Sequence, residues 1–375
     1  MENGIGSLAG CRLQPHSLYA ALSWLRAQAL AGRDPDSWVT ATAGTAVRGA
    51  MPLYRPEQTT NPRYSPGYLL RDVGLASNRV FLAGGLSGYQ SDLLVTEGHE
   101  PESVGVELLG GARQKTGAHL VVVPYLTSFS AAALARDPGC AILIEDLDSS
   151  LEHCDGGLTG HLSRVRSRQR RAIQADLATF ADHGFGTDLR PLAGFEERFA
   201  VLVDANTRKY GGADDISSLT TFLEAIALVY GPDAKLITVT HSGAAIGGVL
   251  AIVHQDCLYL RMIGFDYTLA GNSCAYFQLV FYQPISVARQ LGLARVHLGI
   301  EMNGTKSTRG ATTRPLWTAV YGLAAADVPS ANSRRLYSLC GRVPARLARE
   351  FTATVRRELT EMGAGMDTAG VSSQP

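Results

Sequence analysis

The stretch that decides the fold reads Phe277-Gln-Leu-Val-Phe-Tyr-Gln-Pro-Ile-Ser-Val-Ala-Arg-Gln-Leu-Gly292, then Leu-Ala-Arg-Val-His-Leu-Gly299. Its pattern predicts a long helix over 275–291 and a short strand over 295–300. A polar loop follows, Gly299-Ile-Glu-Met-Asn-Gly-Thr-Lys-Ser-Thr-Arg-Gly-Ala-Thr-Thr-Arg-Pro315. Because α/β proteins usually keep their sites in loops that follow strands, we expect the functional site near this loop.

The composition indicates a globular protein that can bury a sizeable core. The chain has 375 residues, of which 46% are hydrophobic and 18% charged, and its formal net charge is zero. The length suggests two domains, and the zero net charge argues against a globally basic nucleic-acid binder while leaving local patches open. The six cysteines lack the spacing of a zinc site, so no metal is expected. With no signal-peptide pattern and no apolar run of about 20 residues, a cytoplasmic protein without a membrane span is predicted.

Two halves of the chain have similar patterns. Hairpins are predicted over 38–54 and 236–253, and their turns align as Gly44-Thr-Ala-Val-Arg-Gly49 and Gly243-Ala-Ala-Ile-Gly-Gly248. A helix and a strand follow each hairpin, at 101–115 and 119–124 in the first half and at 275–291 and 295–300 in the second. We interpret this recurrence as an internal duplication of one mixed α/β unit.

Two polar segments lie outside this pattern. Residues 56–92 predict a long irregular segment, in which Asn61-Pro-Arg-Tyr-Ser-Pro-Gly-Tyr68 either covers a ligand site or is a surface loop with buried tyrosines. A helix over 158–183 is predicted to carry Arg164, Arg168 and Arg171 on one side, at i, i+4 and i+7. Such a face can hold a polyanion such as a tRNA backbone, or a diphosphate. The alternatives are a solvated helix between the domains, or one that pairs with the acidic residues Glu145, Asp146 and Asp148.

Residues 277–299, together with Lys306-x-x-Arg309-Gly310, resemble the C-terminal half of GNAT-like FemAB and peptidoglycan-biosynthesis type acyltransferases. In those proteins a helix with a Tyr-x-Pro-Ile-like centre leads into a strand, a glycine and a Lys-x-x-Arg-Gly loop. The arginine-rich segment 161–171 and Thr207-Arg-Lys-Tyr-Gly211 are similar to other segments of the family. The resemblance covers residues 155–325.

This resemblance implies a mixed α/β (α+β) fold of tandem GNAT-like units, each with a mostly antiparallel central sheet flanked by helices. Residues 1–150 would form a degenerate N-terminal GNAT-like domain, 151–362 a catalytic C-terminal GNAT-like domain, and 363–375 a disordered tail. The implied enzyme is an amide-forming acyltransferase without a tightly bound cofactor. It would move an aminoacyl group from aminoacyl-tRNA, or another acyl group, onto the amine of a cell-wall precursor or small metabolite.

The donor is the point at which this sequence departs from part of the family. A member that uses acyl-CoA would show a Q/R-x-x-G-x-G/A turn after the strand over 257–264, where backbone N–H groups hold the pyrophosphate. Here the turn reads Phe265-Asp-Tyr-Thr-Leu-Ala-Gly-Asn-Ser273 and has a single glycine. We therefore expect aminoacyl-tRNA as the donor, with acyl-CoA as the alternative.

Amide formation from an activated ester needs a neutral amine, a stabilised oxyanion and a proton path. Lys306, one of only four lysines, and Arg309 are candidates for binding the donor's phosphate or the oxyanion, unless both are merely solvent-exposed. Glu301 is the candidate that accepts the ammonium proton, unless it pairs with Arg309 for structure only. Asp266 is a further catalytic candidate, at the splay between the two central strands. Direct attack of the amine, without a covalent enzyme intermediate, is the expected mechanism.

Further residues are candidates for lining the substrate site. Tyr282 and Gln283 lie on the helix before the polar loop, although a tyrosine beside a proline kink is also a common packing residue. His241 is at a hairpin turn, and the resemblance assigns Lys209 and Tyr210 to the acceptor side.

A hypothesis of a different class remains open. The chain would then be a catalytically silent module that uses the same cleft to bind a peptidoglycan fragment or an RNA. Hydrolase, metalloprotease and NTPase functions lose support, because the sequence contains no G-x-S-x-G elbow, no H-E-x-x-H and no P-loop.

Overall fold

The computed structural model describes residues 5–8, 11–13, 15–59, 61–73, 79–271, 273–323 and 325–366. Backbone contacts divide the protein into two compact units. Unit 1 comprises residues 1–29, 33–148 and 314–375, and unit 2 comprises 30–32 and 149–313. The described residues contain twelve strands, whose pairing is mostly antiparallel, and the strands are flanked by helices. The predicted fold class is confirmed.

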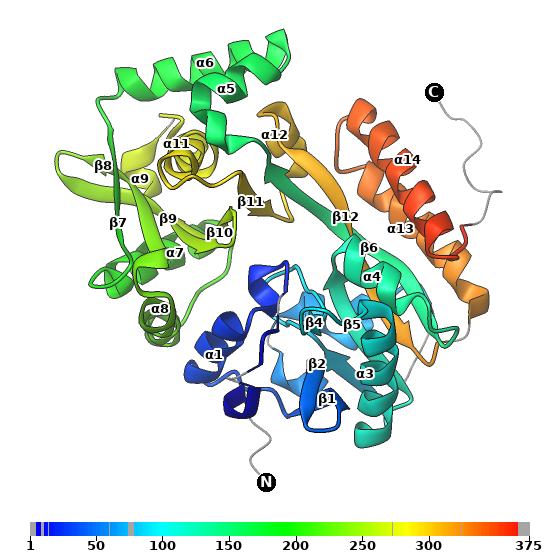
Figure 1. Ribbon diagram of the computed structural model, residues 1–375. Coiled ribbons are helices and arrows are strands. Elements are labelled where there is room, and N and C mark those ends of the chain that lie inside the picture. Colours follow the sequence, from blue (N-terminus) through cyan, green and yellow to red (C-terminus); the bar gives the residue numbers. More distant parts are fainter. Residues whose placement is uncertain are drawn as a thin grey trace. The chain divides into compact units, whose positions relative to one another are not determined.

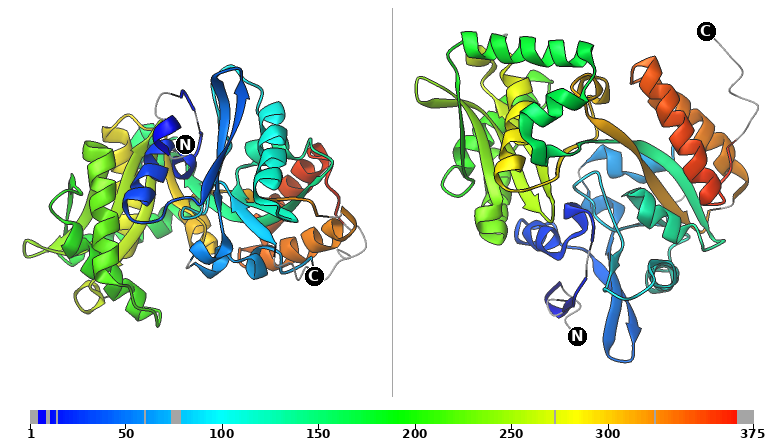
Figure 2. Two further views of the ribbon diagram at one scale, coloured as in Figure 1. Left: turned by 90° about the horizontal axis from the view of Figure 1, so that it is seen from below. Right: turned by 45° about the horizontal axis from the view of Figure 1, so that its top comes forward.

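In unit 1 the hydrogen-bonded strand order is β1-β2-β3-β5-β12-β6, and a short β4 pairs with β2. The strands are β1 (Ser37–Ala43), β2 (Ala46–Tyr54), β3 (Val80–Ala83), β4 (Leu94–Val95), β5 (Leu120–Leu126), β6 (Cys140–Leu151) and β12 (Thr312–Tyr321). The helices are α1 (Leu22–Leu30), α2 (Pro66–Leu69), α3 (Pro101–Thr116), α4 (Ser128–Leu134), α13 (Val328–Cys340) and α14 (Ala345–Glu361). Helices α3, α4, α13 and α14 share one hydrophobic core with the sheet. Figure 2 shows the β1–β2 hairpin as a long ribbon and α13 beside α14.

In unit 2 the order continues as β11-β10-β9-β8-β7, and the last residues of β6 pair with β11. The strands are β7 (Gly186–Pro191), β8 (Ala234–His241), β9 (Ala244–His254), β10 (Cys257–Phe265) and β11 (Arg295–Gly299). The helices are α5 (Gly157–Arg164), α6 (Ser167–Asp182), α7 (Glu196–Lys209), α8 (Ile216–Tyr230), α9 (Tyr267–Ala270), α10 (Ala275–Phe277), a π-helix (Gln278–Tyr282), α11 (Gln283–Gln290) and α12 (Asn303–Thr308). Helix α6, the π-helix and α11 pack on the core of this sheet.

The predicted duplication is visible in the order of the elements. The series β1-β2-β3-α3-β5-α4-β6 recurs as β8-β9-β10-α10/α11-β11-α12-β12. The last strand of each repeat is exchanged, because β12 pairs with β5 of the first repeat and β6 pairs with β11 of the second. Residues 314–362, predicted to belong to the second domain, therefore lie in unit 1.

Each repeat contains one parallel strand pair that separates early. Strand β10 pairs with β11 only over residues 257–259 and 295–297, whereas it remains paired with β9 as far as Phe265. In the first repeat, β3 pairs with β5 only over residues 80–82 and 120–122. Beyond these residues the two parallel strands of each pair no longer bond to each other, and we call the place where this pairing ends the gap between the two strands.

Periodic segments were predicted well and the arginine-rich helix was not. Both hairpins, the helix over 101–115, and the short strand before the polar loop are confirmed within a few residues. The single helix predicted over 158–183 is wrong, because the backbone is extended at Val165 and Arg166 and divides it into α5 and α6. Of the predicted disordered tail, Ala364 and Met366 pack against the unit 1 core, and 367–375 lie outside the described residues.

Among the residues that the structure describes, no helix is both long and apolar enough to cross a membrane. The same residues include no group of three or more His, Cys, Asp or Glu side chains placed to hold a metal ion.

Gly264 in β10 lets α7 approach the sheet closely, and replacing it with alanine tests this packing. A Cβ there would lie 2.5 Å from the backbone carbonyl carbon of Leu202 and the backbone nitrogen of Val203, so we expect Gly264→Ala to lower the free energy of unfolding by about 2–3 kcal/mol or more. Gly110→Ala, in a helix with no atom within 4 Å of the new Cβ, should instead be neutral or stabilise by up to about 1 kcal/mol. Urea unfolding of both variants measures the difference, and equal effects would contradict the packing argument.

Candidate functional site

The polar loop predicted from the sequence follows β11, at the edge where the parallel strands β10 and β11 end. The turn after β10 holds Asp266 and Tyr267, and the turn after β11 holds Glu301 and Lys306. Ligands of α/β sheets commonly bind at such carboxyl ends. Unit 2 therefore offers one edge to which several of the predicted residues belong.

The buried side chain of Lys306 stabilises the turn after β11 through hydrogen bonds to its backbone. Its side chain is 5% exposed, and its ammonium Nζ donates to the carbonyl oxygens of Leu298, Gly299 and Ile300 at 2.8, 2.7 and 3.2 Å. An ammonium group has three N–H donors, so these three carbonyls occupy all of them. The geometry thus gives Lys306 a structural role in the turn and offers no donor to a substrate's phosphate or oxyanion.

The turn that Lys306 holds has an unusual backbone. Gly299, Glu301 and Met302 have φ values of +72°, +26° and +54°, in the left-handed region that costs non-glycine residues free energy. Residues in such conformations persist only where the surroundings determine them, and they cluster at functional sites. We call the three hydrogen bonds from Lys306 to the carbonyls of residues 298–300 the clasp of the turn. Glu301, in the turn that this clasp holds, is exposed to solvent at the end of β11.

Arg309 lies in a polar cluster with α6 and the π-helix. Its Nε is 2.9 Å from Oδ2 of Asp176 and 3.3 Å from the Tyr282 hydroxyl, and its Nη2 is 3.2 Å from Oδ1 of Asp176. The Tyr282 hydroxyl also donates to Asp176, and the Arg309 guanidinium stacks 4.3 Å from the centre of the Phe277 ring. Burial, followed by the bond to Asp176, raises the pKa of Tyr282. Arg309 therefore pairs with Asp176, and the alternative partner considered from the sequence, Glu301, is not the one observed.

The helix before β11 widens into a π-helix at residues 278–282, where the amide of Gln283 donates to the carbonyl of Gln278. Pro284 follows directly and cannot donate a backbone hydrogen bond, which explains why the helix changes its pattern here. The widened turn places Tyr282, which is 1% exposed, toward Asp176. Tyr282 is thus a buried part of the Arg309 cluster, whereas Gln283 is half-buried and has no side-chain hydrogen bond among the described residues.

Asp266 caps the short helix after β10. Its Oδ1 accepts hydrogen bonds from the amides of Thr268 and Leu269, at 2.9 and 3.4 Å, and from the Thr268 hydroxyl at 2.6 Å. These bonds, first that of the Thr268 hydroxyl, lower the pKa of Asp266. A carboxylate stabilised in this way is a weak base, so the geometry favours a capping role over the predicted catalytic one.

Lys209 and Tyr210 lie at the end of α7, beside the turn after β10. The Lys209 ammonium is 3.5 Å from the centre of the Tyr267 ring and 5.7 Å from that of Tyr210. Burial, and then the charges of Tyr210 and Glu301, raise the pKa of Tyr276 to about 12. The structure therefore brings the two predicted residues Lys209 and Tyr210 together with Tyr267, which the sequence did not single out.

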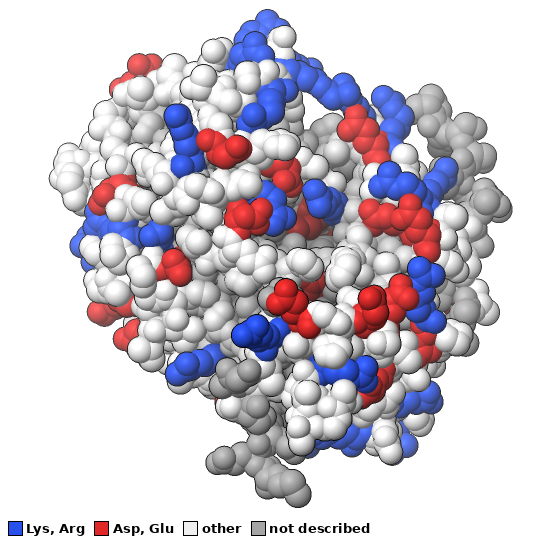
Figure 3. All heavy atoms as spheres, viewed as in Figure 1, with Lys and Arg blue, Asp and Glu red and all other residues white. Residues whose placement is uncertain are grey.

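The remaining candidates lie elsewhere in unit 2. His241 is exposed at the end of β8, and its ring contacts Phe185 with a centroid distance of 5.1 Å. Because α5 and α6 are separate helices, Arg164 does not share a helical face with Arg168 and Arg171. The side chain of Arg164 donates to the carbonyl of His153. Arg168 and Arg171 are exposed in the first turns of α6, and Figure 3 shows Lys and Arg side chains gathered where α5 and α6 meet.

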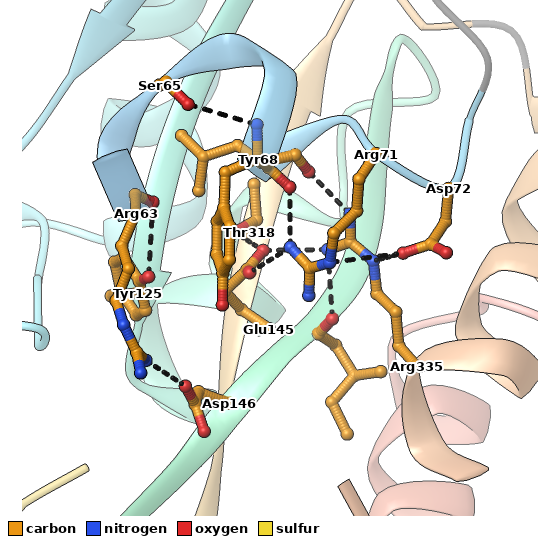
Figure 4. A network of polar contacts seen from close by, with 12 residues as sticks. Arg63, Ser65, Tyr68, Arg71, Asp72, Tyr125, Glu145, Asp146, Thr318 and Arg335 are labelled. Carbon is orange, nitrogen blue, oxygen red and sulfur yellow. Dashed lines mark hydrogen bonds and ion pairs between the residues drawn. The ribbon is translucent and has the colours of Figure 1, made fainter. Parts of the chain in front are cut away.

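The acidic residues of β6 pair with arginines of unit 1, which corrects the suggestion that they pair with the arginine-rich helix. Glu145, 1% exposed, accepts hydrogen bonds from Arg71 and Arg335, each at 2.8 Å, and from the Thr318 hydroxyl. Arg335 also donates to Asp72 at 2.8 Å, as Figure 4 shows. Every charge in this buried network has a partner of opposite sign, as burial of charge requires.

A second polar group of unit 1 surrounds the end of β5. Arg63 pairs with Asp146 at 3.1 Å (Figure 4), and burial raises the pKa of this carboxyl. The rings of Tyr64, Tyr89 and Tyr125 lie 5.1–5.7 Å apart, and Tyr89 and Tyr125 have φ values of +54° and +56°. The segment 61–68 therefore contains a buried tyrosine, Tyr64, and also contributes Arg63 to a buried ion pair.

Some residues of these polar clusters could not be identified from the sequence. Tyr267 and Tyr276 flank the single-glycine turn after β10, yet nothing in their spacing distinguishes them from core residues. Asp176 was missed because its partner, Arg309, is 133 residues away in sequence.

Three solved structures resemble this protein in fold. One is the C-terminal domain of a putative lysylphosphatidylglycerol synthetase from Agrobacterium fabrum, with 10% identity, a TM-score of 0.53 and coverage of 83% of this chain and 92% of that one. The L-PGS of Bacillus licheniformis has 12% identity, a TM-score of 0.53 and coverage of 81% and 89%. FemX has 11% identity, a TM-score of 0.54 and coverage of 90% and 97%.

At these identities the likeness shows the fold alone. No family model matches the sequence, and no curated protein sequence is significantly similar to it. The resemblance to FemAB-type, GNAT-like proteins that the sequence predicted is confirmed at the level of the fold.

Replacing Lys306 tests its role as the clasp of the turn. Lys306→Met keeps the bulk of the side chain but leaves three buried carbonyls without their donor, so we expect it to lower the free energy of unfolding by about 3 kcal/mol. The control is Lys235→Met, because Lys235 is a partly exposed lysine that donates to the single carbonyl of Pro232 and should change stability by less than about 1 kcal/mol. Chemical denaturation compares the two, and a Lys306 variant as stable as the control would refute the clasp.

His161 predicts a pH dependence. Its Nε2 lies 2.8 Å from the carbonyl of Arg309, and burial lowers its pKa below the ordinary 6.5. The unfolded protein then binds more protons than the folded one near this pH, so this contribution to stability is present above 6.5 and is lost as the pH falls through the lowered value. We expect the difference in melting temperature between pH 7.5 and 5.5 to be smaller in His161→Gln than in the unaltered protein. Identical pH profiles would show that His161 titrates as it does in the unfolded protein.

Proposed function

We propose that this protein is an acyltransferase that forms an amide by direct attack of an amine on an activated acyl or aminoacyl ester. The observation that carries the proposal is the likeness in fold to FemX, to the L-PGS of Bacillus licheniformis and to the C-terminal domain of a putative lysylphosphatidylglycerol synthetase, across 81–90% of this chain. The name of the last of these states a lysyl group joined to a lipid, which is an aminoacyl transfer. Coverage of 81–90% is more than either compact unit contains, so the likeness extends into both units.

The gap between β10 and β11 is a suitable place for the acyl carbonyl. Residues 262–265 of β10 remain paired with β9, whereas within the part of the chain that the structure describes β10 pairs with β11 only at residues 257–259. Backbone N–H groups fixed by a sheet are preorganised donors for an oxyanion, since they need no reorganisation when charge develops. This assignment gives the oxyanion role to the backbone of β10 in place of Lys306.

Glu301 is the group that we assign to the amine. It is an exposed carboxylate at the end of β11, held by the clasp of Lys306 in a strained backbone conformation. The acceptor is an ammonium ion at neutral pH and must lose one proton before its nitrogen can attack, and a nearby carboxylate can accept this proton directly or through water. The new C–N bond forms as the acyl C–O bond of the donor ester breaks, and the departing oxygen takes up the proton that Glu301 accepted, directly or through water. No covalent enzyme intermediate is required, because the donor ester is already activated.

The turn after β10 favours aminoacyl-tRNA over acyl-CoA as the donor. The amides of Thr268 and Leu269, which in a CoA-dependent enzyme would face the pyrophosphate, donate to the carboxylate of Asp266. A second anion at this place would be repelled by the first. These bonds belong to the first half of the turn, and Asn272 in its second half lies outside the described residues.

Arginines at the start of α6 support a polyanionic carrier. Arg166, Arg168 and Arg171 are exposed and form no ion pair within the described residues. Free guanidinium groups at a helix N-terminus attract phosphates by charge and by the helix dipole. The acceptor amine would belong to a cell-wall precursor or a small metabolite. The alternatives are an acyl-CoA-dependent N-acyltransferase of specialised metabolism, or a silent module that binds peptidoglycan fragments or RNA.

The test is a transfer reaction in the absence of any other enzyme. The protein is incubated with a mixture of aminoacyl-tRNAs or with acyl-CoAs and a panel of amines, and new amides are detected by mass spectrometry. We expect product from aminoacyl-tRNA and a decrease of about 10-fold or more in Glu301→Gln. Tight binding of one donor without turnover of either would contradict the transferase and favour the binding module.

The same assay tests the carrier surface. Arg168→Ala with Arg171→Ala should weaken tRNA binding and reduce the slope of log affinity against log salt by about 1–2. The matched control replaces Arg346 and Arg349, two exposed arginines of α14 in unit 1. Equal effects of the two pairs would show that tRNA is held by general charge and not at α6.

A further inference from the structure

We propose that Lys209, Tyr210 and Tyr267 form a binding site for the terminal adenine nucleotide of the donor, with the base stacked on Tyr210 and the phosphate paired with Lys209. The inference rests on the proposed function, because an activated donor must be held at this edge for transfer to occur. It differs from the assignment to the acceptor side that the family resemblance implied.

Lys209 differs from the other three lysines of the protein. Lys115, Lys235 and Lys306 each donate hydrogen bonds to backbone carbonyls, at distances of 2.6–3.2 Å. The ammonium of Lys209 has no hydrogen-bond acceptor and no carboxylate partner among the residues that the structure describes. It lies instead near two aromatic rings, 3.5 Å from the centre of Tyr267 and 5.7 Å from that of Tyr210. A cation held on aromatic faces keeps its N–H donors available for an anion.

Tyr210 offers an open aromatic face beside this cation. It is 75% exposed, and it stands at the C-terminal end of α7. Two further large apolar side chains are exposed in the turns at this edge, Leu269 after β10 (52%) and Met302 after β11 (59%). Exposed apolar residues that gather on neighbouring turns mark binding surfaces more often than single ones do.

The side chain of Tyr267 is held in place beside Lys209. Its hydroxyl donates to the side-chain oxygen of Asn206 in α7 at 2.6 Å, so the turn after β10 is bonded to the helix that carries Lys209. The pKa of Tyr267 is raised to about 12, first by burial and then by Tyr210. At neutral pH this phenol is therefore uncharged and does not repel a phosphate. The ring and the ammonium are positioned before any ligand arrives.

The site is adjacent to the groups assigned to the reaction. Tyr267 lies in the turn after β10 and Glu301 in the turn after β11, and β10 and β11 are paired neighbours in the sheet. A nucleotide on Tyr210 would thus lie on the same edge of unit 2 as the carboxylate at the end of β11, and its acyl group would extend toward the gap between β10 and β11.

The chemistry of the site indicates its ligand. An aromatic face stacks any nucleobase, and a lysine beside it pairs with the attached phosphate. The two activated carriers considered for the donor, tRNA and coenzyme A, both end in an adenine nucleotide, so the recognised chemistry is common to them. The test therefore distinguishes the two sources.

Isothermal titration calorimetry with the full-length protein tests the site, using AMP, the trinucleotide CCA, coenzyme A and inorganic phosphate as probes. We expect AMP to bind more tightly than phosphate, Tyr210→Ala to weaken AMP binding by about 10-fold, and Tyr210→Phe to retain it. Lys209→Met should weaken binding by about 5-fold and reduce its salt dependence. The controls are Tyr337→Ala, which removes a tyrosine that is 85% exposed on α13, and Lys235→Met.

Tighter binding of CCA than of coenzyme A assigns the site to tRNA, and the reverse order assigns it to coenzyme A; both support a nucleotide site. AMP binding no tighter than phosphate, or equal effects of Tyr210→Ala and Tyr337→Ala, would overturn the proposal. Nucleotide binding through these residues without amide formation from any donor would contradict the proposed transferase function and support the nucleotide site.

Amide formation with an unchanged donor KM in Tyr210→Ala would contradict the nucleotide site and support the transferase function.

Discussion

The exchange of the last strand between the two repeats is the constraint on which the remaining structure depends. Strand β6 leaves the first repeat to pair with β11, and β12 returns to pair with β5. The segment after β12 thereby brings Arg335 of α13 to Glu145 of β6, 190 residues earlier in the sequence. The segment after β6 brings Asp176 of α6 to Arg309. Two ion pairs, one buried and one partly buried, thus follow from one topological feature, and neither repeat can complete its sheet alone.

The periodicity of apolar residues predicted the elements whose structure depends on nearby residues. It failed for elements whose position is determined by contacts with residues far away in the sequence. The two hairpins have apolar strands with glycine-containing turns between them, so their positions followed from the sequence. Strand β6 was missed because Glu145, Asp146 and Asp148 suggest a solvated segment, whereas arginines and Gln90 from other parts of unit 1 satisfy them. The break between α5 and α6 contains no Pro or Gly. It is fixed by tertiary bonds, among them that of His161 with the Arg309 carbonyl and that of Gln169 with the Ser307 carbonyl.

The sequence directed attention to the loop after β11, and the structure shows protein partners for several of the residues that were predicted to meet a substrate. The loop after β11 was identified from its polar composition, and it does lie at the end of a parallel strand pair. The rarity of lysine drew attention to Lys306, but a buried ammonium with three carbonyl partners is a structural element. Residue type cannot distinguish a lysine that holds its own turn from one that meets a ligand, because the difference lies in which acceptors the fold brings within reach. Lys209 shows the opposite case, since only the structure reveals that it has no such acceptor among the described residues.

The central claim is that one acyl-transfer centre lies in unit 2, at the edge where β10 and β11 separate. The most direct measurement is a crystal structure with a stable donor mimic, an adenosine whose 3′-oxygen is replaced by an aminoacylated nitrogen. The account predicts the acyl carbonyl between Leu260–Phe265 and the end of β11, the base against Tyr210, and Glu301 facing the carbonyl carbon. A donor mimic bound within unit 1, or one whose carbonyl lies away from both strands, would contradict it.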